Sequence, residues 1–205
     1  ILPAVASQYI RAGKSSLFTV AIIAPYGLPE AEHWFYGGFL SFALQWDGEA
    51  ATSSQTVPYA GFNGDYSKLD VIGSAPLSSP QFLDESQNPL TDVAGLTITP
   101  TRNVTLAVTL ALPTRILSAT LVDAGGKALG YIGGGYTEYV ARSQYTKPYI
   151  AMTVARSVYL DKELKLPADA PAGTYRVRVD ALRPFGDPGK ASDFQSWVSG
   201  LFAIA

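Results

Sequence analysis

Short runs of β-branched and aromatic residues recur along this chain, and glycines and prolines interrupt them. The clearest run is residues 175–182, in which apolar and polar residues alternate strictly. A period of two places every second side chain on the same face, as in a strand with one buried face. The 205 residues include 19 glycines and 14 prolines, and no stretch has a clear amphipathic helix pattern. We therefore predict an all-β chain with many turns.

Residues 57–66 separate two strand-rich parts of the chain. Pro58 is typical of a strand end, because proline has no N–H to donate to a ladder of hydrogen bonds. Gly61 and Gly64 supply the backbone freedom for a sharp exit from that strand. We therefore expect three regions, which are a first β-module at residues 1–72, a linker or covering loop at 73–95, and a second β-module at 96–205.

The two predicted modules differ in how many strands they contain. The first has a short strand candidate at residues 8–11 and longer ones at 17–23, 35–46 and 55–57, which are fewer than a complete sandwich needs. Within it, Gly37 and Gly38 indicate a bulge or a close approach of two backbones. The second module has several further candidates, among them residues 104–110, 116–122, 128–132, 149–160, 175–182 and 194–204.

Composition and charge exclude several classes of partner. The net charge is −2 and the basic residues are scattered, so nothing favours a nucleic acid or an anionic membrane as partner. No apolar run reaches the roughly 18 residues that span a bilayer. The absence of cysteine excludes disulfides and thiolate metal sites. The first residues lack the charged and apolar regions of a signal peptide, so we expect a processed product or a fragment.

Two stretches resemble catalytic or phosphate-binding motifs only in part. The single histidine, His33, lies near Glu30 and Glu32, but no nearby serine has the context of an activated nucleophile. A solvated loop histidine is therefore the simpler interpretation. The three glycines at 133–135 are not followed by the Lys-Ser/Thr of a phosphate loop, and they predict a strand break instead. We expect no catalytic residue and no cofactor.

Three further sets of residues are candidates for binding or modification. Asp187 and Asp193, together with Asp180, could bring oxygens to a calcium ion, although their spacing differs from an EF-hand and aspartates in such loops usually solvate turns. Asn103 begins an N-glycosylation sequon, Asn-Val-Thr. Exposed aromatic residues could form a sugar-stacking surface, although burial in a core explains most of them more simply; these are Trp34, Trp46, Trp197 and several tyrosines.

Several stretches together resemble one protein family. Residues 25–29 (Pro-Tyr-Gly-Leu-Pro), 35–40 (Phe-Tyr-Gly-Gly-Phe-Leu) and 57–66 (Val-Pro-Tyr-Ala-Gly-Phe-Asn-Gly-Asp-Tyr) resemble the end of a fibronectin type III-like domain. That domain follows the catalytic domain in large subtilisin-like serine proteases. Residues 171–187 resemble the C-terminal tail of the fungal secreted members, with Gly-x-Tyr, a basic strand, Ala-Leu-Arg, an apolar residue and Gly-Asp. The resemblance covers about residues 7–72 and 115–205.

The resemblance implies two fibronectin III/immunoglobulin-like β-sandwich modules in tandem, the first incomplete because family domains have further strands upstream. Nothing here resembles the Asp, His or Gly-Thr-Ser-Met motifs of the subtilase triad. The chain would then be a non-catalytic accessory region of a secreted, extracellular protease, which stabilises the catalytic domain or helps to position protein substrate. Its partner would be the upstream catalytic region of the same precursor. Two alternatives stay open: a free-standing secreted binding module that takes carbohydrate or acts in adhesion, and an enzyme built around His33.

Overall fold

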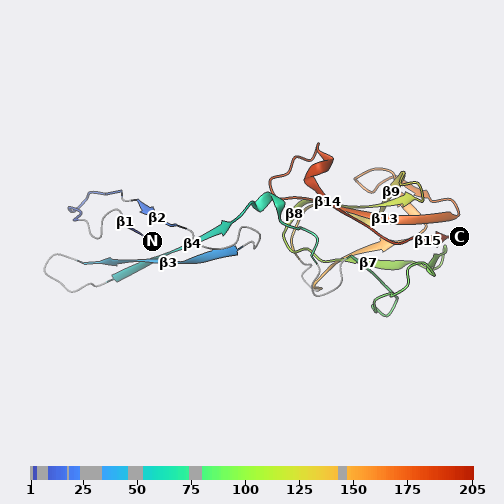
Figure 1. Ribbon diagram of the computed structural model, residues 1–205, viewed down its shortest axis with the longest axis horizontal. Coiled ribbons are helices and arrows are strands. Elements are labelled where there is room, and N and C mark those ends of the chain that lie inside the picture. The colour runs from blue at the N-terminus through green and yellow to red at the C-terminus, as the bar shows by residue number, and fades with distance from the viewer. Residues whose placement is uncertain are drawn as a thin grey trace. The chain divides into compact units, whose positions relative to one another are not determined.

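The computed structural model describes residues 2–3, 9–17, 19–23, 34–45, 53–73, 80–142 and 147–205. The chain divides into two compact units, Ile1–Tyr66 and Ser67–Ala205. Both units are built from strands (Figure 1), so the prediction of an all-β chain is confirmed. The helical elements of the described residues are two short 3₁₀ turns, η1 (Tyr66–Lys68) and η2 (Ala191–Asp193). Neither is long or apolar enough to cross a membrane.

The first unit contains two antiparallel pairs of strands in its described residues. Strand β1 (Leu2–Pro3) pairs with β2 (Val20–Ala21), and β3 (Trp34–Leu44) pairs with β4 (Ser53–Asn63). The prediction of a strand end at Pro58 is wrong, because β4 continues past it to Asn63 and Pro58 lies opposite Phe39. A proline is tolerated there because, among the described strands, β4 has β3 as its one neighbour and an N–H on the open edge has no partner to lose.

Two tyrosines pack against glycines across the β3–β4 hairpin. Tyr36 lies opposite Gly61, and Tyr59 lies opposite Gly38. A Cβ added to Gly38 would lie 2.7 Å from the Tyr59 hydroxyl, so a side chain there would displace the ring. The register has no shift along the hairpin. A Cβ added to Gly37 would lie 2.9 Å from the Tyr59 backbone oxygen, so the predicted close approach of two backbones is confirmed at Gly37, and it occurs without a bulge.

The second unit is a sandwich formed by one curled sheet. Among its described residues the main path of strands is β5-β7-β10-β9-β8-β13-β15-β6, with β11 and β12 attached beside β9 and β14 attached beside β13. All pairs are antiparallel except β15 with β6. The strands are β5 (Gln81–Leu83), β6 (Thr97–Ile98), β7 (Val104–Val108), β8 (Thr114–Asp123), β9 (Ala128–Val140), β10 (Ile150–Val154), β11 (Ser157–Tyr159), β12 (Pro167–Asp169), β13 (Gly173–Leu182), β14 (Phe194–Val198) and β15 (Phe202–Ile204).

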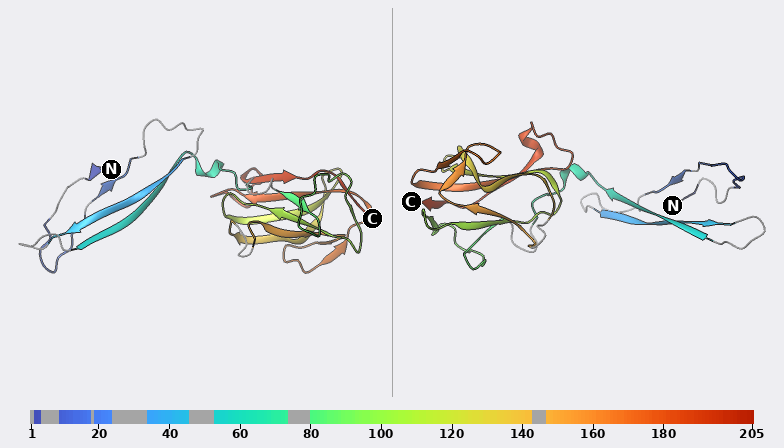
Figure 2. Two further views of the ribbon diagram at one scale, coloured as in Figure 1. Left: turned by 90° about the horizontal axis from the view of Figure 1, so that it is seen from below. Right: turned by 180° about the vertical axis from the view of Figure 1, so that it is seen from behind.

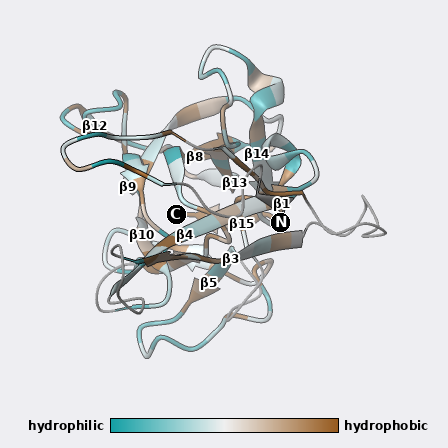
Figure 3. Cartoon of the chain, turned by 90° about the vertical axis from the view of Figure 1, so that its left-hand side faces the viewer, coloured by the Kyte–Doolittle hydropathy of each residue, from teal (hydrophilic) through white to brown (hydrophobic). Residues whose placement is uncertain are grey.

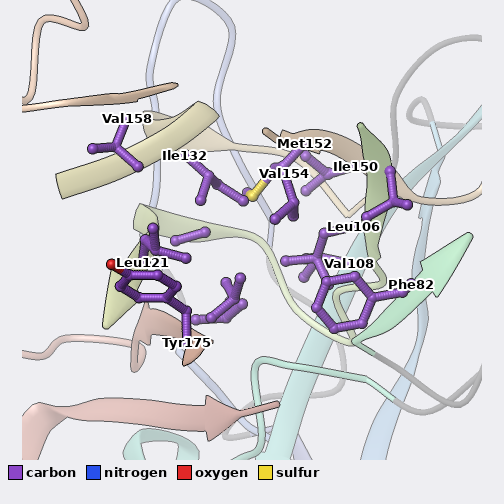
Figure 4. Close-up of a cluster of buried hydrophobic side chains, with 14 of the residues drawn as sticks. Phe82, Leu106, Val108, Leu121, Ile132, Ile150, Met152, Val154, Val158 and Tyr175 are labelled. Atoms are coloured by element: carbon purple, nitrogen blue, oxygen red, sulfur yellow. The ribbon is translucent and has the colours of Figure 1, made fainter. Parts of the chain in front are cut away.

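The core of the second unit lies between two layers of this sheet. Strand β7 belongs to one layer and β13 to the opposite one (Figures 1 and 2). Figure 4 shows side chains of both layers, with Met152 and Val154 gathered near Ile132 and Leu121. The alternation predicted for residues 175–182 is confirmed, since every second residue from Tyr175 to Ala181 is buried. The predicted buried face of residues 104–110 is confirmed as well.

The described residues between 67 and 95 contribute to the core of the second unit. Phe82 and Leu83 of β5 are buried, and the Phe82 ring lies 5.8 Å from the Phe202 ring. Val71 is buried too, and the Gln195 side-chain oxygen accepts hydrogen bonds from the N–H groups of Val71 and Ile72 at 2.6 and 2.8 Å. Part of the expected linker therefore pairs in the sheet, because its short apolar run adds an edge to β7.

The three glycines at 133–135 lie inside β9 rather than at a strand break. The register between β8 and β9 shifts there, between Ser118 and Thr120, and Gly133 pairs with Thr153 of β10. A Cβ on Gly135 would lie 2.7 Å from the Ile132 carbonyl oxygen, so the backbone folds too tightly for a side chain. The prediction of a break is wrong because these glycines form a bulge at which β9 pairs with both layers.

Replacing Leu121 with alanine should destabilise the second unit. Leu121 is fully buried in the core, so the Leu121→Ala variant should lose about 2–5 kcal/mol of unfolding free energy through lost burial and a residual cavity. Chemical denaturation of the full chain measures this loss. The matched variant Leu166→Ala removes an exposed leucine and should change the unfolding free energy by about 0.5 kcal/mol or less. Equal losses in both variants would contradict this description of the core.

Candidate binding surfaces

One face of the β3–β4 hairpin exposes phenylalanines to solvent. Phe35 and Phe39 are 63% and 71% exposed, and they lie on the same face because they are four residues apart on one strand. Phe62, which lies opposite Phe35, packs against it with ring centroids 4.9 Å apart. Figure 3 shows hydrophobic stretches on β3 and β4. We call Phe35, Phe39, Pro58, Ala60 and Phe62 the hairpin face.

The residue pattern of β3 does not indicate that this face is open. Tyr36, Leu40 and Phe42 on the other face of β3 are also apolar, so both faces of the strand look suitable for burial. The structure shows those three side chains partly buried, whereas Phe35 and Phe39 are exposed. Two large apolar side chains exposed on one face make this face a candidate contact surface.

A second candidate surface is the loop at residues 183–193, which joins β13 to β14. Arg183 fixes its base, because its guanidinium donates to the carbonyl oxygens of Lys68 at 3.2 Å and Leu69 at 2.9 Å. Its backbone N–H also donates to the Asp193 carbonyl oxygen at 2.8 Å. The loop borders an open pocket of about 480 Å³. The residues lining it are Ser67, Lys68, Arg183, Pro184, Phe185, Gly186, Ser192 and Asp193.

Phe185 lies at the tip of this loop in an uncommon conformation. Its side chain is 91% exposed, and its φ of 61° lies in the left-handed region that bulky residues rarely adopt. The turn that holds it is closed by the Gly186 N–H, which donates to the Arg183 carbonyl oxygen at 3.0 Å. The sequence motif around Phe185 therefore forms a fixed turn that presents an aromatic ring to solvent.

The two calcium candidates of the sequence lie together in this loop. The Asp187 N–H donates to Asp193 Oδ2 at 2.8 Å, and Asp187 Oδ1 accepts the Gly189 N–H at 2.9 Å. Both carboxylates therefore accept hydrogen bonds from the loop itself. Asp180 is engaged elsewhere, by Arg178 and Ser196. In the part of the chain that the structure describes, no three acidic or histidine residues gather as a metal site would require.

The remaining candidates lie in separate places. His33 and Trp46 lie outside the described residues, as does the Pro25-to-Pro29 stretch of the family resemblance. Trp197 is partly buried and packs against the core, as the simpler interpretation of the aromatics predicts. Asn103 is exposed just before β7, and it helps to line a pocket of about 320 Å³ with Asp84, Glu85, Ser86, Leu90, Arg102 and Val104.

Comparisons with known proteins do not assign the chain to a family. No protein-family model and no curated protein sequence matches it. Among solved structures, CopC from Methylosinus trichosporium OB3b is 16% identical with a TM-score of 0.29, over 61% of this chain and 92% of CopC. A candidate DNA-binding protein from Bacteroides vulgatus ATCC 8482 is 14% identical with a TM-score of 0.28, over 83% of this chain and 69% of that protein. Similarities this low carry no argument about function.

Asp193 should titrate at an unusually low pH. The hydrogen bond from the Asp187 N–H lowers the pKa of the Asp193 carboxyl, the Ser192 hydroxyl and the Lys190 ammonium act in the same direction, and partial desolvation opposes them. Because the pKa is lower in the folded chain, the carboxylate stabilises the loop fully above the ordinary pKa of aspartate, and this contribution is lost as the pH falls through the folded value. An NMR titration of the side-chain carbon should show the low midpoint.

The Asp193→Asn variant provides the control for this titration. It should accelerate hydrogen exchange of the Asp187 amide, because a neutral amide oxygen accepts that hydrogen bond less strongly than a carboxylate. The Glu85→Gln variant removes an exposed carboxylate in another loop and should leave the Asp187 amide unchanged. An ordinary midpoint for Asp193, or unchanged exchange in Asp193→Asn, would contradict the assigned hydrogen bond.

Proposed function

We propose that this chain is a non-catalytic accessory region of a secreted subtilisin-like serine endopeptidase. The hairpin face docks on the catalytic region of the same precursor and stabilises it, or helps it to position protein substrate. The single observation that carries the docking is the exposure of Phe35 and Phe39 on one face of the hairpin. The assignment of the partner is supported by the resemblance of residues 7–72 and 115–205 to the C-terminal part of fungal subtilases.

The two units differ in a way that supports this proposal. The second unit encloses a core that extends across most of its strands, with the phenylalanines Phe82 and Phe202 buried in it. The hairpin face of the first unit keeps comparable side chains in water. Burying a phenylalanine side chain contributes about 1.5–3 kcal/mol, so covering Phe35 and Phe39 with a partner surface supplies a driving force for association.

The proposed protease partner predicts the size of the native assembly. Material purified from its natural source should be a species larger than 22 kDa in native conditions. Under denaturing conditions this species should either separate into this chain and a longer chain or remain one longer polypeptide, in both cases with sequence motifs of a subtilase in the longer part. Intact mass and native size determination measure this. A single species near 22 kDa in both conditions would overturn the proposal and favour a free-standing binding module.

The hairpin face should determine the affinity of this chain for the catalytic region. The Phe39→Ser variant should weaken binding of this chain to the separately produced catalytic region by about tenfold or more, which corresponds to about 1.4 kcal/mol. Surface plasmon resonance measures the affinity, and circular dichroism checks that the variant remains folded. The control variant Leu160→Ser removes another exposed apolar side chain, in the second unit, and should leave the affinity unchanged. Equal affinity of Phe39→Ser and the unaltered chain would place the docking surface elsewhere.

A secreted eukaryotic origin predicts a glycan on Asn103. Asn103 is exposed, and Val104 between the two sequon residues is buried, so Asn103 and Thr105 lie on the outward side of the β7 segment. Secretion from a yeast host should add an N-glycan that a peptide N-glycosidase removes, as intact mass would show. The Thr105→Ser variant keeps the sequon and the glycan, whereas Asn103→Gln should lose both. An unmodified mass for the unaltered chain would contradict the prediction.

A further inference from the structure

Three tyrosines lie next to one another on the outer face of the second unit. Ser118 and Thr120 of β8 alternate with core residues and therefore face away from the core. Tyr136 lies opposite Ser118, and Tyr131 lies opposite Thr120. Tyr159 of β11 in turn lies opposite Tyr131 on the other side of β9. Residues opposite each other in a sheet share a face, so all three tyrosines project outwards.

The glycine bulge of β9 brings the rings of Tyr131 and Tyr136 into contact on the outer face. These residues are five positions apart on β9, whereas their partners Thr120 and Ser118 are two positions apart on β8. In a regular strand, residues an odd number apart point to opposite faces. The extra residues of the bulge bring both tyrosines to the outer face, with ring centroids 5.5 Å apart. Bulges often re-aim side chains in this way near functional sites.

Polar side chains continue the same face across β8, β13 and β14. Asp180 lies opposite both Ser118 and Ser196, and Arg178 lies opposite Thr120. Arg178 Nε donates to Asp180 Oδ2 at 2.8 Å, and the Ser196 hydroxyl donates to Asp180 Oδ1 at 2.5 Å. We call this surface the tyrosine face. Its residues are Tyr131, Tyr136 and Glu138 on β9, Tyr159 on β11, Ser118 on β8, Arg176, Arg178 and Asp180 on β13, and Ser196 on β14. Thr120 lies on the same side of the sheet but is buried.

The charges of the tyrosine face balance one another. Arg176 and Arg178 carry two positive charges, and Asp180 and Glu138 carry two negative ones. Asp180 forms an ion pair with Arg178, and Glu138 accepts a hydrogen bond from the Tyr136 hydroxyl at 2.9 Å. Arg176 Nε, in contrast, is buried without a hydrogen-bond partner. The four charges nevertheless sum to zero, so these side chains give little long-range attraction for a polyanion or a polycation. The complement of this face is a neutral ligand with many hydrogen-bonding groups.

We propose that the tyrosine face binds a neutral carbohydrate chain. The apolar C–H face of a sugar ring packs on an aromatic ring, while the hydroxyl groups at the edge of the sugar bond to polar side chains beside it. Tyr159 on β11 lies one strand away from Tyr131 on β9, a spacing of about 4.8 Å. The Tyr131 and Tyr136 rings, both on β9, pack edge to face with an interplanar angle of 68°, so a sugar stacks on the open face of one ring at a time. Arg178, whose side chain is 42% exposed, and the exposed Ser196 continue this surface with polar groups, and the largely buried Asp180 holds both of them in place.

This proposal is independent of the proposed protease partner. The tyrosine face lies entirely in the second unit, whereas the docking of the catalytic region uses the hairpin face of the first. The phenylalanines of the hairpin face have no hydroxyl groups, and they suit an apolar protein surface better than a sugar. Failure of one proposal therefore leaves the other unaffected, because each has its own residues and its own ligand.

Affinity gel electrophoresis of the full chain tests the proposal. The probes are three neutral polysaccharides, laminarin, yeast mannan and hydroxyethyl cellulose, and two charged ones, the polyanion alginate and the polycation chitosan. At least one neutral polysaccharide should retard the chain, and added salt should not abolish the retardation. Retardation by none of the neutral probes, or by a charged probe alone, would overturn the proposal.

Variants of two tyrosines on the same strand localise the binding. Tyr131→Ala should weaken binding to the retarding polysaccharide by about tenfold or more. Tyr139→Ala removes a tyrosine of β9 that is 78% exposed and lies off the tyrosine face, so it should change binding by less than about twofold. Tyr131→Phe keeps the ring and should retain most of the affinity. If Tyr131→Ala and the unaltered chain bind the polysaccharide with equal affinity, the tyrosine face is not the binding site.

Two glycine variants test the role of the bulge. Gly134 has a φ of 73° in the bulge, and Gly126 has a φ of 88° in the turn between β8 and β9, so alanine is strained at both positions. Both variants should be destabilised, and Gly134→Ala should also lose carbohydrate binding, because it disturbs the pairing of Tyr131 with Tyr136. NMR shifts caused by the polysaccharide should involve the rings of Tyr131, Tyr136 and Tyr159. Shifts confined to residues of the β3–β4 hairpin would overturn the assignment of the carbohydrate site to the tyrosine face.

Discussion

The second unit depends on the exchange of partners by β9. This strand pairs with β8 along most of its length, and at Gly133 it pairs with Thr153 of β10. The two layers of the sandwich are joined at this point, so the core between them is bounded by one continuous sheet. Gly135 has no space for a side chain, because a Cβ there would lie 2.7 Å from the Ile132 carbonyl oxygen, and a Cβ on Gly133 would lie 3.1 Å from the Thr153 Cβ, which is a tight contact.

The same bulge links the fold to the surface. It keeps Ile132 in the core while it turns both Tyr131 and Tyr136 outwards. A local irregularity in a sheet costs some hydrogen bonds, and here the cost is offset by the core that the joined layers enclose. The tyrosine face is therefore a consequence of how the sandwich is joined, and a change in the bulge affects both stability and the outer surface.

The two units differ in how far their apolar side chains are buried. In the second unit, an aromatic contact between Phe82 and Phe202 joins an early strand to the last one and closes the core. In the first unit, Tyr36 and Tyr59 cover glycines on one side of the hairpin, while Phe35 and Phe39 stay exposed on the other. The difference explains why the first unit is the one that suits a partner protein.

The sequence by itself determined the class of fold and the core strands whose pattern is local. Alternation predicted the buried face of residues 175–182, and the strand candidates at 116–122 and 128–132 lie within β8 and β9. Tertiary structure decided the rest, because these features depend on partners far away in the sequence. Gln195 binds the backbone of Val71 across 124 positions, and the bulge acts through β8 and β10. Tyr131 and Tyr136 project from the same face although they are five positions apart, which contradicts a period of two. The sequence of β9 alone therefore could not predict that their rings meet.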